Sequence, residues 1–182
     1  SETDRLMSEY RISEALIGLY KFIWGDFCSW YLEVIKPEDG KLSRTTYDRT
    51  ISAFEKMMTL LHPYMPFITE EVWHQLRNRA KGDDCIVSTW PIAGLENGDL
   101  LKDFARLQQL ISSVRETRNS RGIKAREPLT AFIQQSSESE ATFKRAGWVA
   151  VVKKLAYLES LELTAEEPKN AVRFLTGNDT SY

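Results

Sequence analysis

Basic side chains recur at short, regular steps late in the first two thirds of the chain. The set is Arg115, Arg118, Arg121, Lys124 and Arg126. Positions three apart on a helix drift by roughly 60°, so the three arginines are expected to form one slanting stripe. Lysine and arginine provide the salt-dependent attraction for the phosphates of a nucleic acid. These five residues are therefore our candidate RNA-binding site.

The same cluster also has an interpretation that needs no ligand. Cations near the C-terminal end of a helix are stabilised by the helix dipole alone. Runs of charge are also commonly no more than a solvated helix face. The sequence leaves both interpretations open.

Residue types that serve catalysis or metal binding occur without a catalytic pattern. His62 and His74 have no cysteine nearby at metal-ligand spacing, which favours structural roles for both. The pairs Glu70-Glu71 and Glu166-Glu167 are adjacent, so on a helix their side chains point in different directions. No glycine-rich phosphate loop is present. We expect no catalytic residue, no metal ligand and no cofactor in this chain.

Large aromatic side chains are concentrated in one early segment. The set is Phe22, Trp24, Phe27, Trp30 and Tyr31. At helical spacing, such residues are usually core, and Phe27 and Tyr31 lie on the apolar face of the predicted helix. Trp24 and Trp30 point elsewhere, toward another part of the protein or toward an RNA base. The sequence does not decide between these two surroundings.

Apolar residues at three- and four-residue steps predict the helices that position these side chains. The predicted ranges are about 13–36, 44–61, 66–80 and 98–121. Ser13 suits the N-cap of the first helix, Pro63 ends the second, and Pro66 opens the third. Four amphipathic helices predict an antiparallel helical bundle over residues 1–122.

The pattern changes after Gly122. Strands are predicted near 129–133, 158–163 and 171–175, with short helices near 138–145 and 148–156, and Cys85-Ile86-Val87 is expected to be extended. Gly177-Asn178-Asp179 would turn the chain, but we expect no return strand before its end. The predicted fold class is therefore mainly α, with a truncated α/β appendage over residues 123–182.

Composition limits the class of protein. With 42% hydrophobic residues, the 182-residue chain can bury a sizeable core. A net charge of −2 argues against a globally basic nucleic-acid binder, but allows local patches. No apolar run approaches the ~20 residues of a membrane span, and no signal-peptide pattern opens the chain. Two cysteines set no disulfide framework, so we expect a cytoplasmic location.

Three stretches together resemble a known family. They are Leu19 to Glu33, the proline corner from Leu60 to Trp73, and Val114 to Ile123. In this order they are similar to the anticodon-binding region of valyl-tRNA synthetases, which are class I aminoacyl-tRNA synthetases. Isoleucyl- and leucyl-tRNA synthetases share a looser form of the proline corner. The signatures H-I-G-H and K-M-S-K-S of the class I catalytic domain are absent.

The resemblance implies a tRNA-binding module of a valine–tRNA ligase. Its partners would be the anticodon stem-loop of valine-accepting tRNA and the catalytic domain of the same enzyme, which would bind ATP. Two alternatives stay open. The module could be a structural helical unit that braces a catalytic domain, or it could be the equivalent domain of an isoleucyl- or leucyl-tRNA synthetase.

Overall fold

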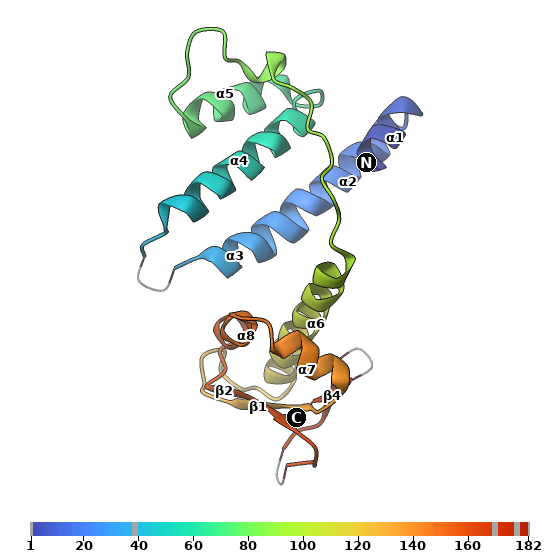
Figure 1. Ribbon diagram of the computed structural model, residues 1–182, viewed down its shortest axis with the longest axis vertical. Helices are drawn as coiled ribbons and strands as arrows, with labels where there is room; N and C mark the ends of the chain where they lie inside the picture. Colours follow the sequence, from blue (N-terminus) through green and yellow to red (C-terminus); the bar gives the residue numbers. More distant parts are fainter. Residues whose placement is uncertain (1, 38–39, 169–170, 177–178, 182) are drawn as a thin grey trace. The chain divides into compact units, whose positions relative to one another are not determined.

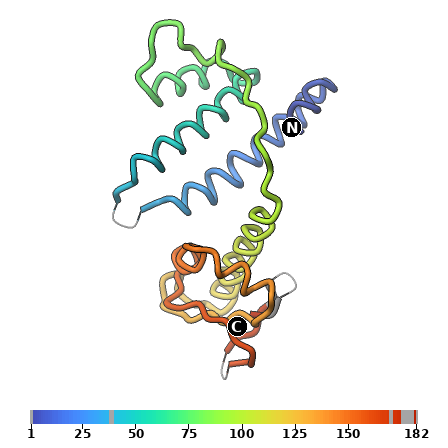
Figure 2. Tube along the Cα trace, in the orientation of Figure 1, coloured from blue at the N-terminus to red at the C-terminus, as the bar shows by residue number. Residues whose placement is uncertain are grey.

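The computed structural model describes residues 2–37, 40–168, 171–176 and 179–181, and the chain divides into two units. The first unit covers residues 1–95 and the second covers 96–182, and both can be followed along the trace in Figure 2. This boundary differs from the predicted one at residue 122. Helix α6 (Gly98–Ser120) packs against helix α8 (Trp148–Ala156) and strand β3 (Phe174–Thr176), so it belongs to the second unit.

Helices make up most of the first unit. They are α1 (Glu2–Ser8), α2 (Ile12–Tyr20), the wider π-helical segment η1 (Lys21–Tyr31), α3 (Leu32–Ile35), α4 (Arg44–Leu61), α5 (Pro66–Leu76) and the 3₁₀ turn η2 (Cys85–Val87). Figure 1 shows α2, η1 and α3 as one continuous rod, with α4 running back beside it. The helix predicted over 13–36 is thus one helical rod whose middle turns are wider than α-helical.

Local signals set most of the helix ends. The Ser43 hydroxyl caps α4 by accepting the backbone N–H of Thr46 at 3.1 Å. Pro66 occupies the first turn of α5, where its missing N–H costs nothing. Ser13 is not an N-cap, because α2 begins at Ile12. Helix α5 also ends before the predicted limit near residue 80, and η2 forms a tight turn where an extended segment was expected.

The core of the first unit lies between the rod, α4 and α5. Its buried members are Leu19, Phe27, Met57, Met58, Leu61, Trp73 and Cys85. The ring of Phe27 stacks on Tyr31 at 5.3 Å and on Phe54 at 5.7 Å between centroids. Phe27 is therefore a core residue, as predicted. Tyr31 is half-buried, and its hydroxyl lies 3.1 Å from the Thr50 hydroxyl.

A four-stranded sheet organises the second unit. Its strands run in the order β2 (Ser160–Thr164), β1 (Thr130–Gln134), β4 (Asp179–Ser181) and β3. Strands β1 and β2 are parallel, so the chain between them must cross over, and α7 (Ser137–Phe143) and α8 form that crossover. Strand β4 pairs antiparallel with both β1 and β3.

Strand β4 corrects one prediction, because it is the return strand that the sequence seemed to lack. The expected turn residues Gly177 and Asn178 lie outside the described residues. The sheet packs against helices, and Figure 1 shows α7 and α8 on one side of it. Buried residues there come from α6 (Leu107, Leu110, Ile111, Val114), β1 (Ala131, Ile133) and α8 (Val152, Leu155, Ala156).

The fold class follows from these two units. The chain is mainly helical with a small α/β part, as predicted. Among the residues that the structure describes, none of the helices combines the length and apolar character of a bilayer span.

Candidate nucleic-acid interface

Arg118 lies inside the second unit rather than on its surface. It is only 4% exposed, and its guanidinium is enclosed by backbone carbonyls. Nη1 donates to the carbonyls of Lys124 at 3.1 Å and Glu127 at 2.8 Å, and Nη2 donates to the carbonyl of Tyr157 at 2.8 Å. The prediction that Arg118 contacts RNA is therefore wrong, because no phosphate reaches a buried, enclosed guanidinium.

The enclosed guanidinium has a structural effect. Burial lowers the pKa of Arg118 below its usual value, because desolvation disfavours the charged form. Its hydrogen bonds join the end of α6 to two points of the following loop and to the residue after α8. Arg118 thus fixes the path of the loop on which the remaining basic residues lie.

Arg115 also donates to the backbone. Its Nε and Nη2 donate to the carbonyl of Leu155 at 3.1 and 2.7 Å. That carbonyl lies in the last turn of α8, where backbone oxygens have no N–H donor within the helix. The guanidinium of Arg115 is therefore already bound to protein.

Like Arg115, the other three residues of the predicted cluster are exposed. Arg121, Lys124 and Arg126 all lie at or just after the end of α6. There the chain reverses at Gly122, whose φ of 66° is in the left-handed region that favours glycine. The N–H of Ile123 returns to the carbonyl of Arg118 at 2.9 Å, which is the pattern of a Schellman helix end.

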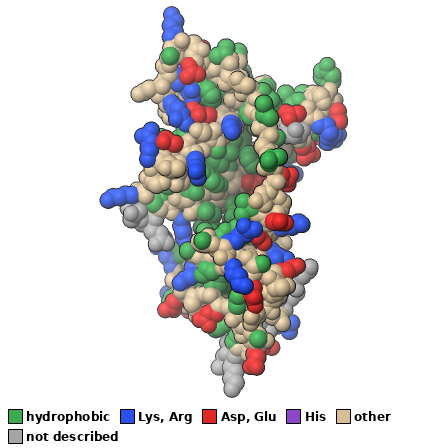
Figure 3. All heavy atoms as spheres, viewed as in Figure 1, with side chains coloured by type: hydrophobic (Ala, Val, Ile, Leu, Met, Phe, Trp, Pro, Cys, Tyr) green, Lys and Arg blue, Asp and Glu red, His purple; other side chains and the backbone are tan. Residues whose placement is uncertain are grey.

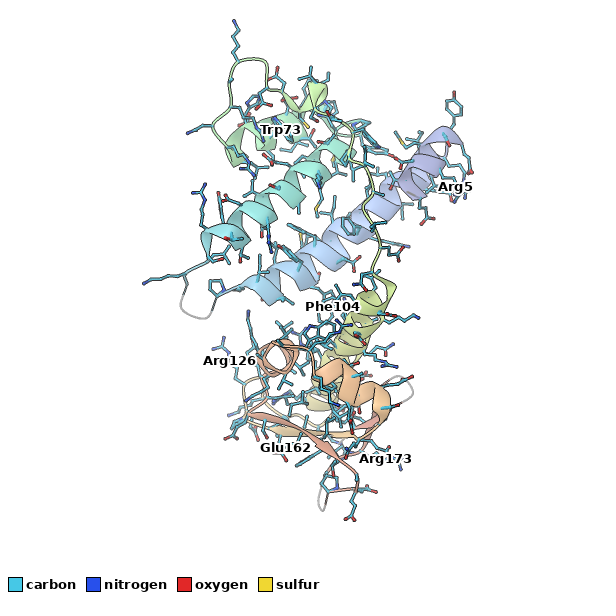
Figure 4. The ribbon with its side chains drawn as sticks, viewed as in Figure 1. Arg5, Trp73, Phe104, Arg126, Glu162 and Arg173 are labelled. Atoms are coloured by element: carbon cyan, nitrogen blue, oxygen red, sulfur yellow. The ribbon has the colours of Figure 1, made fainter. Side chains whose placement is uncertain are left out.

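Arg126 is exposed and lies beside an aromatic ring. Its guanidinium carbon lies 5.8 Å from the ring centre of Tyr157, and Figure 4 shows it at the edge of the unit beside α8. Figure 3 shows lysine and arginine intermixed with aspartate and glutamate on the face in view. This mixture of charges on the face in view is in keeping with the net charge of −2.

The proline corner of the first unit contains His62, and His74 follows it directly; both have hydrogen-bond partners. His62 Nδ1 lies 2.8 Å from the hydroxyl of Thr69. Glu70 accepts the backbone N–H groups of Cys85 at 2.7 Å and Ile86 at 3.3 Å, which fastens α5 to η2. Both contacts are structural. The first holds the end of α4 against α5 across the proline corner, and the second holds α5 against η2.

His74 extends the same network. Its Nε2 lies 3.0 Å from Asp84 Oδ1 and 3.3 Å from Glu70 Oε1. One nitrogen or oxygen of each of these three side chains lies within 4.8 Å of the others, and all three are residue types that bind divalent metals. His74 is hydrogen-bonded to Asp84, and Glu70 accepts the backbone N–H groups of η2, so each of the three side chains has a protein partner. That both histidines have structural roles and bind no metal stays a prediction.

Similarity to known proteins identifies the family. Residues 1–133 match the family described as the anticodon-binding domain of tRNA ligase. The chain belongs to this family. The match covers all of the first unit, helix α6 and most of β1, so it includes both the proline corner and the basic loop.

Individual relatives are similar over nearly the whole chain. Valine–tRNA ligase from Porphyromonas gingivalis is 38% identical over 97% of this chain, and that from Bacteroides fragilis is 37% identical over 97%. Valine–tRNA ligase from Thermosynechococcus vestitus is 39% identical over 88%. The chain spans about a fifth of the length of these relatives. The resemblance inferred from the three sequence stretches is confirmed.

The enclosure of Arg118 was not predicted, although the sequence contained a signal for it. Leu107, Ile111 and Val114 mark the buried side of α6, and Arg118 continues that series at the next four-residue step. A charged residue in an apolar series is expected to be buried and hydrogen-bonded. Arg118 therefore belongs to two patterns at once, the stripe of arginines at three-residue steps and the apolar series of α6.

Proposed function

We propose that this chain is the anticodon-binding part of a valine–tRNA ligase. The match of residues 1–133 to the anticodon-binding family carries the proposal, and the names of the relatives favour valine over isoleucine or leucine. The complete enzyme would activate valine with ATP and attach it to tRNA. This part would hold the anticodon stem-loop, and ATP would bind to the catalytic domain of the same enzyme, in the cytoplasm.

Exposed cations after α6 would contact the RNA backbone. Arg121, Lys124 and Arg126 are open to solvent, and the hydrogen bonds of Arg118 fix the loop that carries them. Each phosphate neutralised in a single-stranded loop releases counterions, which adds about 0.7 to the slope of log affinity against log salt. Three contacts would therefore add about 2 to that slope.

Binding of a labelled anticodon stem-loop tests this function. Fluorescence anisotropy at several salt concentrations should show tighter binding of the valine stem-loop than of a hairpin with the same stem and an unrelated loop. Equal binding of the two hairpins would contradict recognition of the anticodon by this chain.

A matched pair of variants tests the basic loop. Replacing Arg121, Lys124 and Arg126 together with alanine should weaken binding to both hairpins and reduce the salt slope by about 2. A control variant should remove the same total charge elsewhere, by replacing the exposed residues Lys41, Lys81 and Lys102. Equal losses in the two variants would mean that net charge matters and that the loop does not.

The exposed apolar surface at the proline corner favours a second, compatible role. Phe67 is 91% exposed and lines an open depression with Pro66 and Ile86. Exposed apolar patches often mark protein interfaces. We propose that this surface braces another domain of the ligase. Replacing Phe67 with serine in the full-length ligase should lower aminoacylation while stem-loop affinity is retained, and unchanged aminoacylation would contradict the role.

A further inference from the structure

Two large aromatic rings stand outside the core on the long helical rod. Tyr20 is 61% exposed and Trp24 is 62% exposed. Their ring planes are within 3° of parallel, and their centroids are 6.5 Å apart. By contrast, Leu19 and Phe27 of the same rod are buried in the core. The rod thus has a buried side and an outer side, and the outer side carries a stacked aromatic pair.

The local structure holds the pair in place without burying it. Residues four apart lie above one another on a helix, so Tyr20 and Trp24 stack along its surface. The hydroxyl of Ser29 donates to the backbone carbonyl of Trp24 at 2.7 Å within the wider turns of η1. Ile17, which is also exposed, lies three residues before Tyr20 and lengthens the apolar strip.

Tyr20 and Trp24 would stabilise the fold if their rings were buried, but the rings are exposed to water. Aromatic side chains bury roughly 150–250 Å² each when they enter a core, and Phe27 makes that contribution on the same rod. A flat, parallel and exposed pair suits a flat partner that covers it face-on. An exposed cation adjoins the pair, because Lys21 lies three residues before Trp24 on the helix surface.

We propose that Tyr20 and Trp24 form a stacking platform for an unpaired RNA base, with Lys21 placed for the phosphate beside it. The proposal rests on the proposed function, because the family match is what makes RNA the expected partner. Bases in an anticodon loop can be splayed out and stacked on aromatic side chains. Stacking of this kind needs no hydrogen-bond reading, so the platform contributes affinity and position rather than base identity.

Four single variants test the platform with the valine stem-loop. Tyr20→Ala and Trp24→Ala should each lower affinity by about tenfold. Loss of one base–aromatic stack typically lowers affinity by this amount or more. Trp24→Phe keeps a ring and should retain most of the affinity. Phe67→Ala is the matched control, because it removes an even more exposed aromatic ring from the same unit and should leave affinity unchanged.

Two further measurements separate stacking from charge and from misfolding. The salt slope of Trp24→Ala should equal that of the unmodified chain, because no phosphate contact is lost. A stem-loop carrying 2-aminopurine at each loop position in turn should show one position whose fluorescence is quenched on binding, and Trp24→Ala should remove that quenching. The melting temperatures of all four variants should stay close to that of the unmodified chain, because the replaced side chains are exposed.

The outcomes distinguish this proposal from the function on which it rests. If the unmodified chain prefers the valine hairpin while Tyr20→Ala and Trp24→Ala bind it equally well, the platform is wrong and the function stands. If the unmodified chain shows no preference and the two alanine variants bind like it, both are wrong. If the variants bind RNA normally but weaken association with the catalytic domain of the ligase, the aromatic pair is a protein contact instead.

Discussion

Each unit of this chain buries an arginine, and the two units satisfy it differently. In the first unit, the Arg79 side chain is 7% exposed and forms ion pairs with Glu55 and with Asp83. Its guanidinium carbon also lies 3.7 Å from the ring centre of Trp73. Arg79 Nε donates to one backbone carbonyl, that of Trp73, at 2.9 Å. In the second unit, Arg118 donates to three backbone carbonyls.

A buried arginine can join side chains through an ion pair, or it can hold a backbone loop in place through hydrogen bonds to carbonyls. A carboxylate neutralises the charge of Arg79, and the pair joins side chains of α4 to those of the segment after α5. Carbonyl dipoles compensate Arg118 only in part, but they belong to the backbone, so the arginine determines where a loop runs. A buried ion pair is weak evidence for stability in itself, whereas removing one partner is costly in both arrangements.

The largest expected effect is that of Arg118→Ala. Three carbonyls would lose a charged donor and a cavity would form, so we expect the second unit to lose about 4 kcal/mol of stability. Urea unfolding followed by the fluorescence of Trp148, in a chain whose other tryptophans are replaced by phenylalanine, would measure the loss. Arg121→Ala is the control, because Arg121 is exposed and its loss should cost less than about 0.5 kcal/mol. Equal stability of the two variants would show that the carbonyl contacts contribute little.

Glu55→Ala should have the next largest effect. It would remove the carboxylate that pairs with both Arg79 and Arg77, and would leave buried Arg79 with the carboxylate of Asp83 alone, at a cost of about 3 kcal/mol to the first unit. Helical circular dichroism during urea unfolding would measure it, with exposed Glu71→Ala as the control. A loss greater than that of Arg118→Ala would reverse the expected order, and would mean that neutralising a buried charge matters more than hydrogen-bonding it to carbonyls.

Trp73→Phe should lower the free energy of unfolding of the first unit by less, about 1 kcal/mol. Phenylalanine keeps a ring under Arg79, but the indole N–H that donates to the carbonyl of Asp83 at 3.0 Å is lost. The same substitution at exposed Trp24 should leave stability unchanged. A loss of several kcal/mol at Trp73 would indicate that the indole ring itself, rather than its hydrogen bond, holds the arginine.

The smallest effect is kinetic and concerns the two thiols of the first unit. Burial raises the pKa of Cys85, and the charge of Glu70 adds to the shift. A raised pKa means less thiolate at a given pH, so iodoacetamide at about pH 8 should modify half-buried Cys28 first and Cys85 only as the unit opens. Mass spectrometry of timed samples would show the order. Early modification of Cys85 would mean that the proline corner and η2 open easily.

Sequence reasoning succeeded where the signals were local. The helix starts after Ser43 and at Pro66 depend on residues within one turn, and both were predicted. The similarity of three stretches to one family also gave the assignment that the family match supports. These features need no knowledge of distant contacts.

Predictions failed where distant segments had to meet. An amphipathic face such as that of α6 can pack on other helices or on a sheet, and nothing within the helix says which. Strand β4 has three residues and is recognised only through its pairing with β1 and β3. Arg118 was misassigned for the same reason, because one of the carbonyls that enclose it belongs to Tyr157.

That separation of Arg118 from Tyr157 has a consequence for synthesis on the ribosome. The chain emerges N-terminal end first, so Arg118 leaves the exit tunnel 39 residues ahead of the carbonyl that completes its enclosure. Until Tyr157 has been translated, this guanidinium lacks one of its three carbonyl partners, whereas Lys124 and Glu127 follow it within nine residues. The loop carrying the cations proposed to bind tRNA therefore acquires its final geometry late in the translation of this region.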